Sequence, residues 1–122
     1  MLAALAAIPL SAFSMTLHDA GGNLFVFEFA RQSADYCEEK GFSVRAHYDA
    51  WLKENEPLQG KSIAAISTES KKNGLSQAEI EKIMSGSDAF IRQKAASLIK
   101  EQDVPCDKFQ AMIDKFSAYL KK

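Results

Sequence analysis

The stretch at residues 24–40 reads LFVFEFARQSADYCEEK, and its interpretation decides the fold of the chain. Three phenylalanines recur at every second position near its start, a spacing that suits a β-strand. A second series, which recurs at helical spacing, runs from Val26 to Cys37, and Gly41 is a natural helix stop. We therefore predict a helix over 24–40, although its first six residues, 24–29, fit either a helix or a strand.

Two shorter helices are expected next along the chain. Ser43 can cap a helix over about 44–55, which Pro57 is expected to end. The segment at 61–73 has only a short apolar face, so it is either a full helix or partly loop, and Gly74 fits its end.

The clearest helix start is the sequence Ser76-Gln77-Ala78-Glu79. It matches a capping box, in which the side chains of Ser76 and Glu79 each accept a hydrogen bond from the other residue's backbone amide. An apolar pattern then continues to Leu98. A glycine inside a helix costs about 1 kcal/mol relative to alanine, so we expect a kink or break near Gly86. The last helix follows Asp103-Val104-Pro105, because proline suits a first helical turn.

Short connections between these helices favour antiparallel neighbours. We predict an all-α fold, either a compact bundle or an orthogonal array of about four to five helices. Residues 24–122 would form this single helical domain, and the polar, glycine-containing stretch within residues 15–23 would be a flexible N-terminal segment.

The first 14 residues contain no charged side chain. Their apolar run has the length of a secretory signal core and is shorter than the roughly 20 residues of a membrane-spanning helix. We interpret residues 1–14 as a signal peptide cleaved after Ser14, so we expect an exported protein, periplasmic or extracellular, without a permanent membrane anchor. A signal normally begins with a basic residue. Either the α-amino group supplies the only positive charge here, or Met1 lies inside a longer signal; the alternative is an N-terminal helix packed on the domain.

Cys37 and Cys106 are the only two cysteines in the chain. In an oxidising compartment, such a pair in a small domain favours a disulfide. Each cysteine lies on the inward stripe of its helix, so the bond would join the first predicted helix to the last. The large loop that it closes corresponds to about 4 kcal/mol in the chain-entropy model. The alternative is two free buried thiols in a cytosolic protein.

Charge and motifs point to no particular chemistry. Lys and Arg number 15 against 16 Asp and Glu, and this balance gives no argument for nucleic acid or an anionic membrane as a partner. His18 and His47 lie in different segments, without the spacing of a zinc or haem site. Ser97 and Lys100 match Ser-x-x-Lys, but no partner motif accompanies them. We therefore expect no catalytic residue, no metal and no cofactor, and hence no enzymatic activity.

Aromatic residues remain as candidates for function. Phe25, Phe27 and a third phenylalanine surround more than one face of a helix, so either that helix is central or some of them contact a partner. With Tyr48 and Trp51 they form our candidate interaction surface. The first hypothesis is an interaction protein that presents a helical surface to a protein partner, as inhibitor and immunity proteins do, or to a second copy. The alternative is a carrier of a small hydrophobic ligand in an interhelical cavity.

Overall fold

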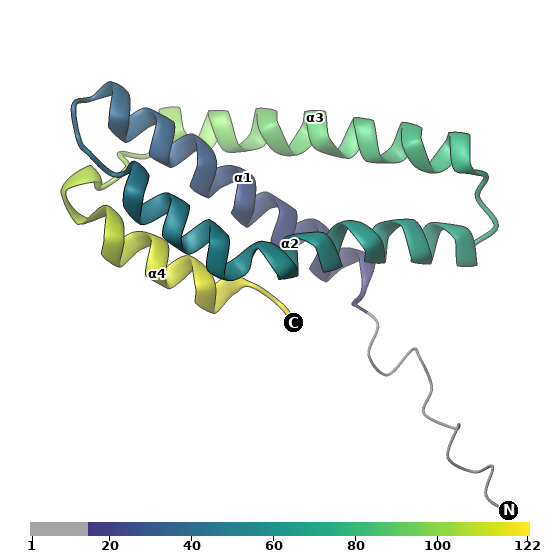
Figure 1. The fold of residues 1–122 in the computed structure, drawn as a ribbon. Helices are drawn as coiled ribbons and strands as arrows, with labels where there is room; N and C mark the ends of the chain where they lie inside the picture. Colours follow the sequence, from purple (N-terminus) through teal and green to yellow (C-terminus); the bar gives the residue numbers. More distant parts are fainter. Residues whose placement is uncertain (1–14) are drawn as a thin grey trace, which may run out of the picture.

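The computed structural model describes residues 15–122, and these form an all-α fold (Figure 1). The predicted signal peptide, residues 1–14, lies outside the described residues. The described part consists of four α-helices and one 3₁₀ turn: α1 (Leu17–Glu39), α2 (Arg45–Lys72), α3 (Gln77–Glu101), η3 (Cys106–Lys108) and α4 (Phe109–Tyr119). None of these helices combines the length and the apolar character that crossing a membrane requires.

Helix α1 begins earlier than the sequence suggested. Residues 17–23, which we expected to be flexible, form its first turns. The Thr16 hydroxyl caps them by accepting a hydrogen bond from the Asp19 amide at 3.0 Å. Ala20 and Asn23 in these turns are completely buried. Burial against the domain therefore outweighs the low helix propensity of the two neighbouring glycines.

The end of α1 is the predicted one. Gly41 has a φ of +91°, which favours glycine, and it lets the chain turn back on itself. The Phe42 amide donates to the Cys37 carbonyl at 2.9 Å and the Gly41 amide donates to the Glu38 carbonyl at 3.0 Å, the pattern of a Schellman cap. The next helix starts differently from our expectation. The Glu38 carboxylate, and not Ser43, accepts at the start of α2, from the amides of Val44 and Arg45 at 2.7 and 2.8 Å.

Helix α2 is one continuous helix where we expected two. It passes through Pro57, which was predicted to end the first of them. Proline removes one intrahelical hydrogen bond, here to the carbonyl of Lys53. Both residues are exposed, so water can replace the lost donor. Figure 1 shows that α2 bends partway along its length, as expected of a helix that contains proline. The segment at 61–73 is thus helical as far as Lys72.

Helix α3 carries the predicted capping box. The Ser76 amide donates to the Glu79 carboxylate at 2.9 Å, and the Glu79 amide donates to the Ser76 hydroxyl at 3.2 Å. The hydrogen bonds from the Ser76 backbone and side chain hold the pKa of Glu79 below its usual range. The predicted break at Gly86 is wrong, because α3 continues through it to Glu101. Figure 1 also shows no kink in α3 like the bend of α2. A cost of about 1 kcal/mol does not interrupt a helix whose neighbouring turns are intact.

The predicted disulfide between Cys37 and Cys106 is confirmed. Its two Cα atoms lie 5.4 Å apart, and it joins the end of α1 to the turn η3 that precedes α4. An inward stripe of α4 continues from this bond. Phe109 and Ile113 on this stripe are buried, as are both cysteines and Leu120, which directly follows α4. A disulfide indicates that the protein folds in an oxidising environment.

Helix α1 lies at the centre of the domain and packs against α2, α3 and α4. The main core cluster surrounds α1 from its middle, where Phe27 contacts Trp51, to Cys37. A smaller cluster of Met15, Ala20 and Ile66 lies at its first turns. In Figure 1 the second half of α2 and the first half of α3 run side by side beyond the main core and are joined by a short turn. This extended end of the molecule holds the candidate site.

Candidate functional site

Three of the four residues in the predicted interaction surface lie in the core. Phe27, Tyr48 and Trp51 expose at most 6% of their surface. The rings of Phe27 and Trp51 have centroids 5.3 Å apart, and the Trp51 indole donates to the Ser117 hydroxyl at 2.9 Å. The prediction of a surface at these positions is therefore wrong for these three. The physical reason is that α1 is covered on several sides, so aromatic rings around it are buried.

Phe25 differs from these three residues. It is half-buried and stacks on Phe29 with ring centroids 5.9 Å apart. Its ring lines a groove bounded by α1, the second half of α2 and α3. It also borders a smaller apolar hollow of about 180 Å³ that reaches Phe116 and Tyr119 of α4. Phe25 is thus the predicted site residue that the structure places at an accessible cavity.

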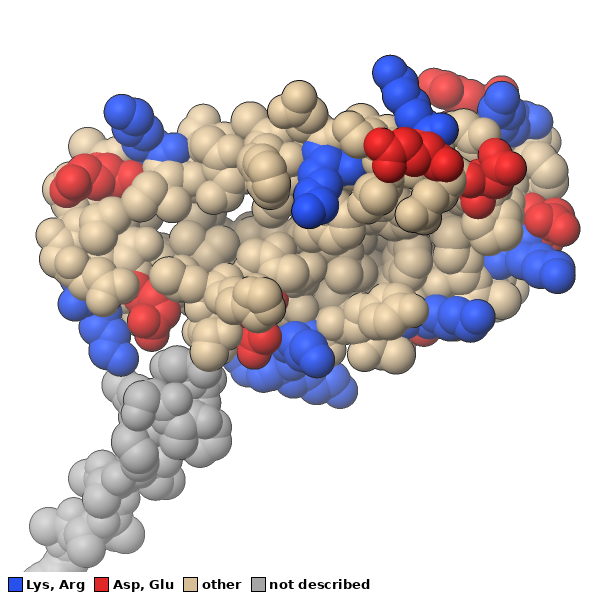
Figure 2. Space-filling view, turned by 180° about the vertical axis from the view of Figure 1, so that it is seen from behind, with Lys and Arg blue, Asp and Glu red and all other residues tan. Residues whose placement is uncertain are grey.

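The groove has a volume of about 1090 Å³ and is open to solvent. Figure 2 shows the molecule hollowed, with gaps between the side chains, at the left of the view, where α2 and α3 are joined. Its walls are mainly apolar, and seven large apolar side chains line it: Leu17, Phe25, Ile66, Leu75, Ile83, Phe90 and Ile91. Such a concave, mainly apolar surface is typical of a ligand site.

Three glycines also line the groove: Gly21 and Gly22 on α1, and Gly86 on α3. All three lie inside helices and none has a positive φ, so the backbone does not require them. A Cβ atom added at any of them would meet no atom within 4 Å, so helix packing does not require them either. Each costs helix stability of about 1 kcal/mol relative to alanine. They leave space in the groove that side chains at these positions would occupy.

The polar residues of the groove are few. Three carry hydroxyl or amide groups: Ser70, Asn73 and Ser87. Two carry basic groups, His18 on α1 and Lys94 on α3, and both of these side chains are exposed at the rim. His47, the other histidine, lies exposed on α2 outside the groove. Within residues 15–122 no three His, Cys, Asp or Glu side chains gather as metal ligands would.

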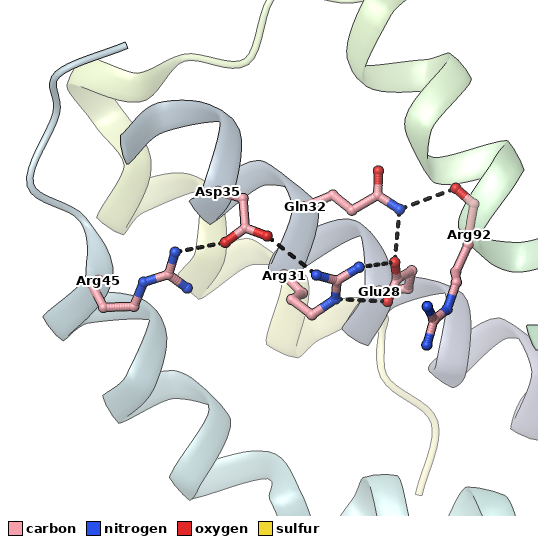
Figure 3. Close-up of polar contacts among 6 residues, drawn as sticks. All are labelled: Glu28, Arg31, Gln32, Asp35, Arg45 and Arg92. Atoms are coloured by element: carbon pink, nitrogen blue, oxygen red, sulfur yellow. Dashed lines mark hydrogen bonds and ion pairs between the residues drawn. The ribbon is translucent and has the colours of Figure 1, made fainter. Parts of the chain in front are cut away.

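A polar network on the second half of α1 joins it to the start of α2 and to α3 (Figure 3). The Asp35 carboxylate accepts from the Arg31 guanidinium at 3.2 Å and from the Arg45 guanidinium of α2 at 2.6 Å. On the other side, the Gln32 amide donates both to Glu28, at 2.7 Å, and to the Arg92 carbonyl of α3, at 3.0 Å. Of these contacts, the one between Gln32 and Arg92 lies next to the groove residues Ile91 and Lys94 on α3.

Glu28 is the carboxylate of this network that accepts hydrogen bonds from both Arg31 and Gln32. Burial alone would raise its pKa, but hydrogen bonds from Arg31 and Gln32, together with the charges of Arg31 and Arg92, outweigh burial and lower it. Glu28 is therefore a structural anion, neutralised by its neighbours. It is not among the residues that line the groove.

Sequence reasoning missed most of the groove residues. They come from segments that look unremarkable one by one: the glycine-containing start of α1, the end of α2 and the middle of α3. One signal was present in the sequence. Gly86 lies inside a predicted helix, where glycine costs about 1 kcal/mol relative to alanine and no turn explains it.

No protein-family model matches the chain, and comparison with curated proteins and with solved structures gives no match either. The groove itself is therefore the main basis for inferring function.

Proposed function

We propose that the protein is an exported, non-catalytic binding protein that holds a small hydrophobic ligand in the groove between α1, α2 and α3. The observation that carries this proposal is the volume of about 1090 Å³ behind mainly apolar walls. Ligand pockets typically measure roughly 300–1,000 Å³, so the groove is large enough for a small molecule with a substantial apolar part.

The three groove glycines support the same proposal. A helix that only had to pack on its neighbours would gain stability from alanine at Gly21, Gly22 or Gly86. Space next to each of them is empty, so alanine would fit there. Loss of helix stability without a packing reason is expected where function needs the space.

The disulfide supports the exported location. A bond between Cys37 and Cys106 persists in an oxidising compartment. Together with the signal peptide predicted over residues 1–14, it favours the periplasm or the outside of the cell as the place where the ligand is bound.

A protein partner is the second candidate occupant of the groove. Large apolar side chains stand partly exposed around it, with Phe90 63% and Leu17 44% exposed. An amphipathic helix of a partner could lay its apolar face in such a groove. The small-molecule proposal is favoured because the cavity is hollowed between helices and extends to the half-buried Phe25.

The test is binding of N-phenyl-1-naphthylamine, a neutral fluorescent hydrophobe, to the protein without residues 1–14. We expect saturable binding that Gly86→Phe weakens about ten-fold or more, because the new ring fills the groove. Gly60→Phe is the matched control. Gly60 is also a helical glycine with open space around it, but it lies outside the groove.

Two outcomes would contradict the proposal. One is no saturable binding by the parent protein, and the other is equal binding by Gly86→Phe and Gly60→Phe. If instead Gly86→Phe abolished capture of a defined protein partner while the parent bound no small hydrophobe, the partner-helix function would replace the carrier function.

A further inference from the structure

We infer that the ligand of the groove is a single-chain amphiphile with an anionic head group, and that the head group lies at Lys94. This inference rests on the proposed function and specifies the chemical class of the ligand. Apolar walls suit the chain, and the charges around the groove select the head group.

Among residues 15–122, no carboxylate lines the groove, although acidic residues slightly outnumber basic ones in the chain, 16 to 15. Its ionisable lining residues are His18 and Lys94. A cationic ligand would find no partner of opposite charge among the lining residues, and a neutral one would gain nothing from Lys94. An anionic group gains Coulomb energy without meeting a like charge on the lining.

Lys94 lies where a head group would emerge from an apolar wall. Its Nζ is 5.9 Å from the centre of the Phe90 ring, one turn away on α3. Within residues 15–122 it forms no ion pair. The neighbouring Arg92, by contrast, is bound to Asp88 at 2.9 Å. The positive charge of Lys94 is therefore not neutralised by an ion pair within the described residues, and it can attract an anionic ligand.

A separate amphiphile fits these observations better than a membrane surface does. Adsorption to an anionic bilayer needs a cluster of basic residues on one face. On the face shown in Figure 2, basic and acidic side chains are scattered and interspersed. Lys94, which forms no ion pair within residues 15–122, lies exposed beside mainly apolar walls, and this suits one head group at the end of one chain.

The experiment compares dodecanoate, dodecanol and dodecylamine as competitors of bound N-phenyl-1-naphthylamine at low ionic strength, each below the concentration at which it forms micelles. We expect Lys94→Gln to weaken dodecanoate binding about two- to five-fold, because an exposed ion pair is lost. Dodecanol binding should stay unchanged and dodecylamine binding should not weaken. About 1 M salt should abolish the difference between the parent and Lys94→Gln.

Lys100→Gln is the matched control, because Lys100 is an exposed lysine of the same helix outside the groove. Equal dodecanoate affinity for the parent, Lys94→Gln and Lys100→Gln would overturn the assignment of the head group while leaving the hydrophobic-ligand function intact. Parent protein that binds dodecylamine more tightly than dodecanoate would overturn the anionic class. Failure of all three competitors and of the probe would overturn the proposed function itself. Sedimentation of the protein with anionic vesicles, at equal extent for Lys94→Gln, would assign the binding to a bilayer surface instead.

Discussion

Asn23 shows how one polar residue can organise a buried region. Its side chain has no exposed surface, yet its hydrogen-bonding groups are occupied. The amide donates to the Ser62 hydroxyl at 3.0 Å and to the Lys121 carbonyl at 2.8 Å, and the Asn23 carbonyl oxygen accepts from the Lys121 amide at 2.7 Å. One side chain therefore ties α1 to α2 and to the end of the chain. Buried polar groups are tolerated when they are satisfied in this way.

We expect Asn23→Ala to lower the free energy of unfolding by about 1–3 kcal/mol, because the Lys121 amide and the Ser62 hydroxyl lose a partner. Urea denaturation followed by circular dichroism measures this loss. Hydrogen exchange should show that the Lys121 amide becomes the most affected site near the chain end. Gln110→Ala, at an exposed position of α4, should change stability by no more than about 0.5 kcal/mol. Equal stability of the two variants would mean that the Asn23 bonds are not made in solution.

At the scale of elements, α1 and α3 are held together by packing and by a hydrogen-bonded bridge that includes a charged side chain. Gln32 bridges the Glu28 carboxylate and the Arg92 carbonyl, and the negative charge of Glu28 strengthens the hydrogen bonds that it accepts from Gln32 and Arg31. Glu28 has a lowered pKa in the folded protein. A carboxylate whose pKa is lower in the folded than in the unfolded state stabilises the fold above its unfolded pKa. That stabilisation is lost as pH falls through the folded value.

We therefore expect the stability advantage of the parent protein over Glu28→Gln to be largest near neutral pH. It should shrink as the pH falls below about 4.3, the ordinary glutamate pKa. Urea denaturation at several pH values between about 5 and 3 measures the difference. The control is Glu54→Gln, an exposed glutamate of α2 outside any ion pair of residues 15–122. A constant difference between the parent and Glu28→Gln across this range would refute the role of the Glu28 charge.

Comparison of the predicted with the observed helix boundaries shows where local sequence signals were sufficient to predict a boundary. The capping box at Ser76 and the stop at Gly41 depend on residues within a few positions, and both were predicted correctly. Pro57 and Gly86 are local signals as well, but their costs of about 3 and 1 kcal/mol compete with burial of the whole helix. Burial of the helix after Pro57 depends on contacts with α1, which a local pattern does not contain.

At the scale of the whole molecule, the bond between Cys37 and Cys106 closes most of the described chain into a loop, since the cysteines lie 69 positions apart. It holds the end of α1 to the start of the last helical segment, beside the main core cluster. The groove lies toward the other end of α1, where no disulfide constrains the helices. Core stability and groove shape are thus supported by different parts of the fold.

We expect the double variant Cys37→Ala/Cys106→Ala to lose about 4 kcal/mol of stability, because the unfolded chain regains the entropy of the open loop. Such a loss is a large fraction of the roughly 5–15 kcal/mol that stabilises a typical domain. Guanidinium denaturation gives the value, and the parent protein with its disulfide reduced should lose a similar amount. A loss below about 1 kcal/mol in both cases would show that the bond adds little to this fold.

Composition, periodicity and capping residues by themselves determined that this chain is all-α, where several of its helices begin and end, and that its two cysteines pair. These properties depend on the spacing of residues along one helix, which a sequence displays directly. Only the tertiary structure decided which faces are covered. Phe27, Tyr48 and Trp51 are buried because α1 lies among three other helices. Phe25, three glycines and Lys94 meet at one groove because α1, the second half of α2 and α3 together bound it. Burial and cavity shape arise from contacts between residues far apart in the chain, so no local pattern records them.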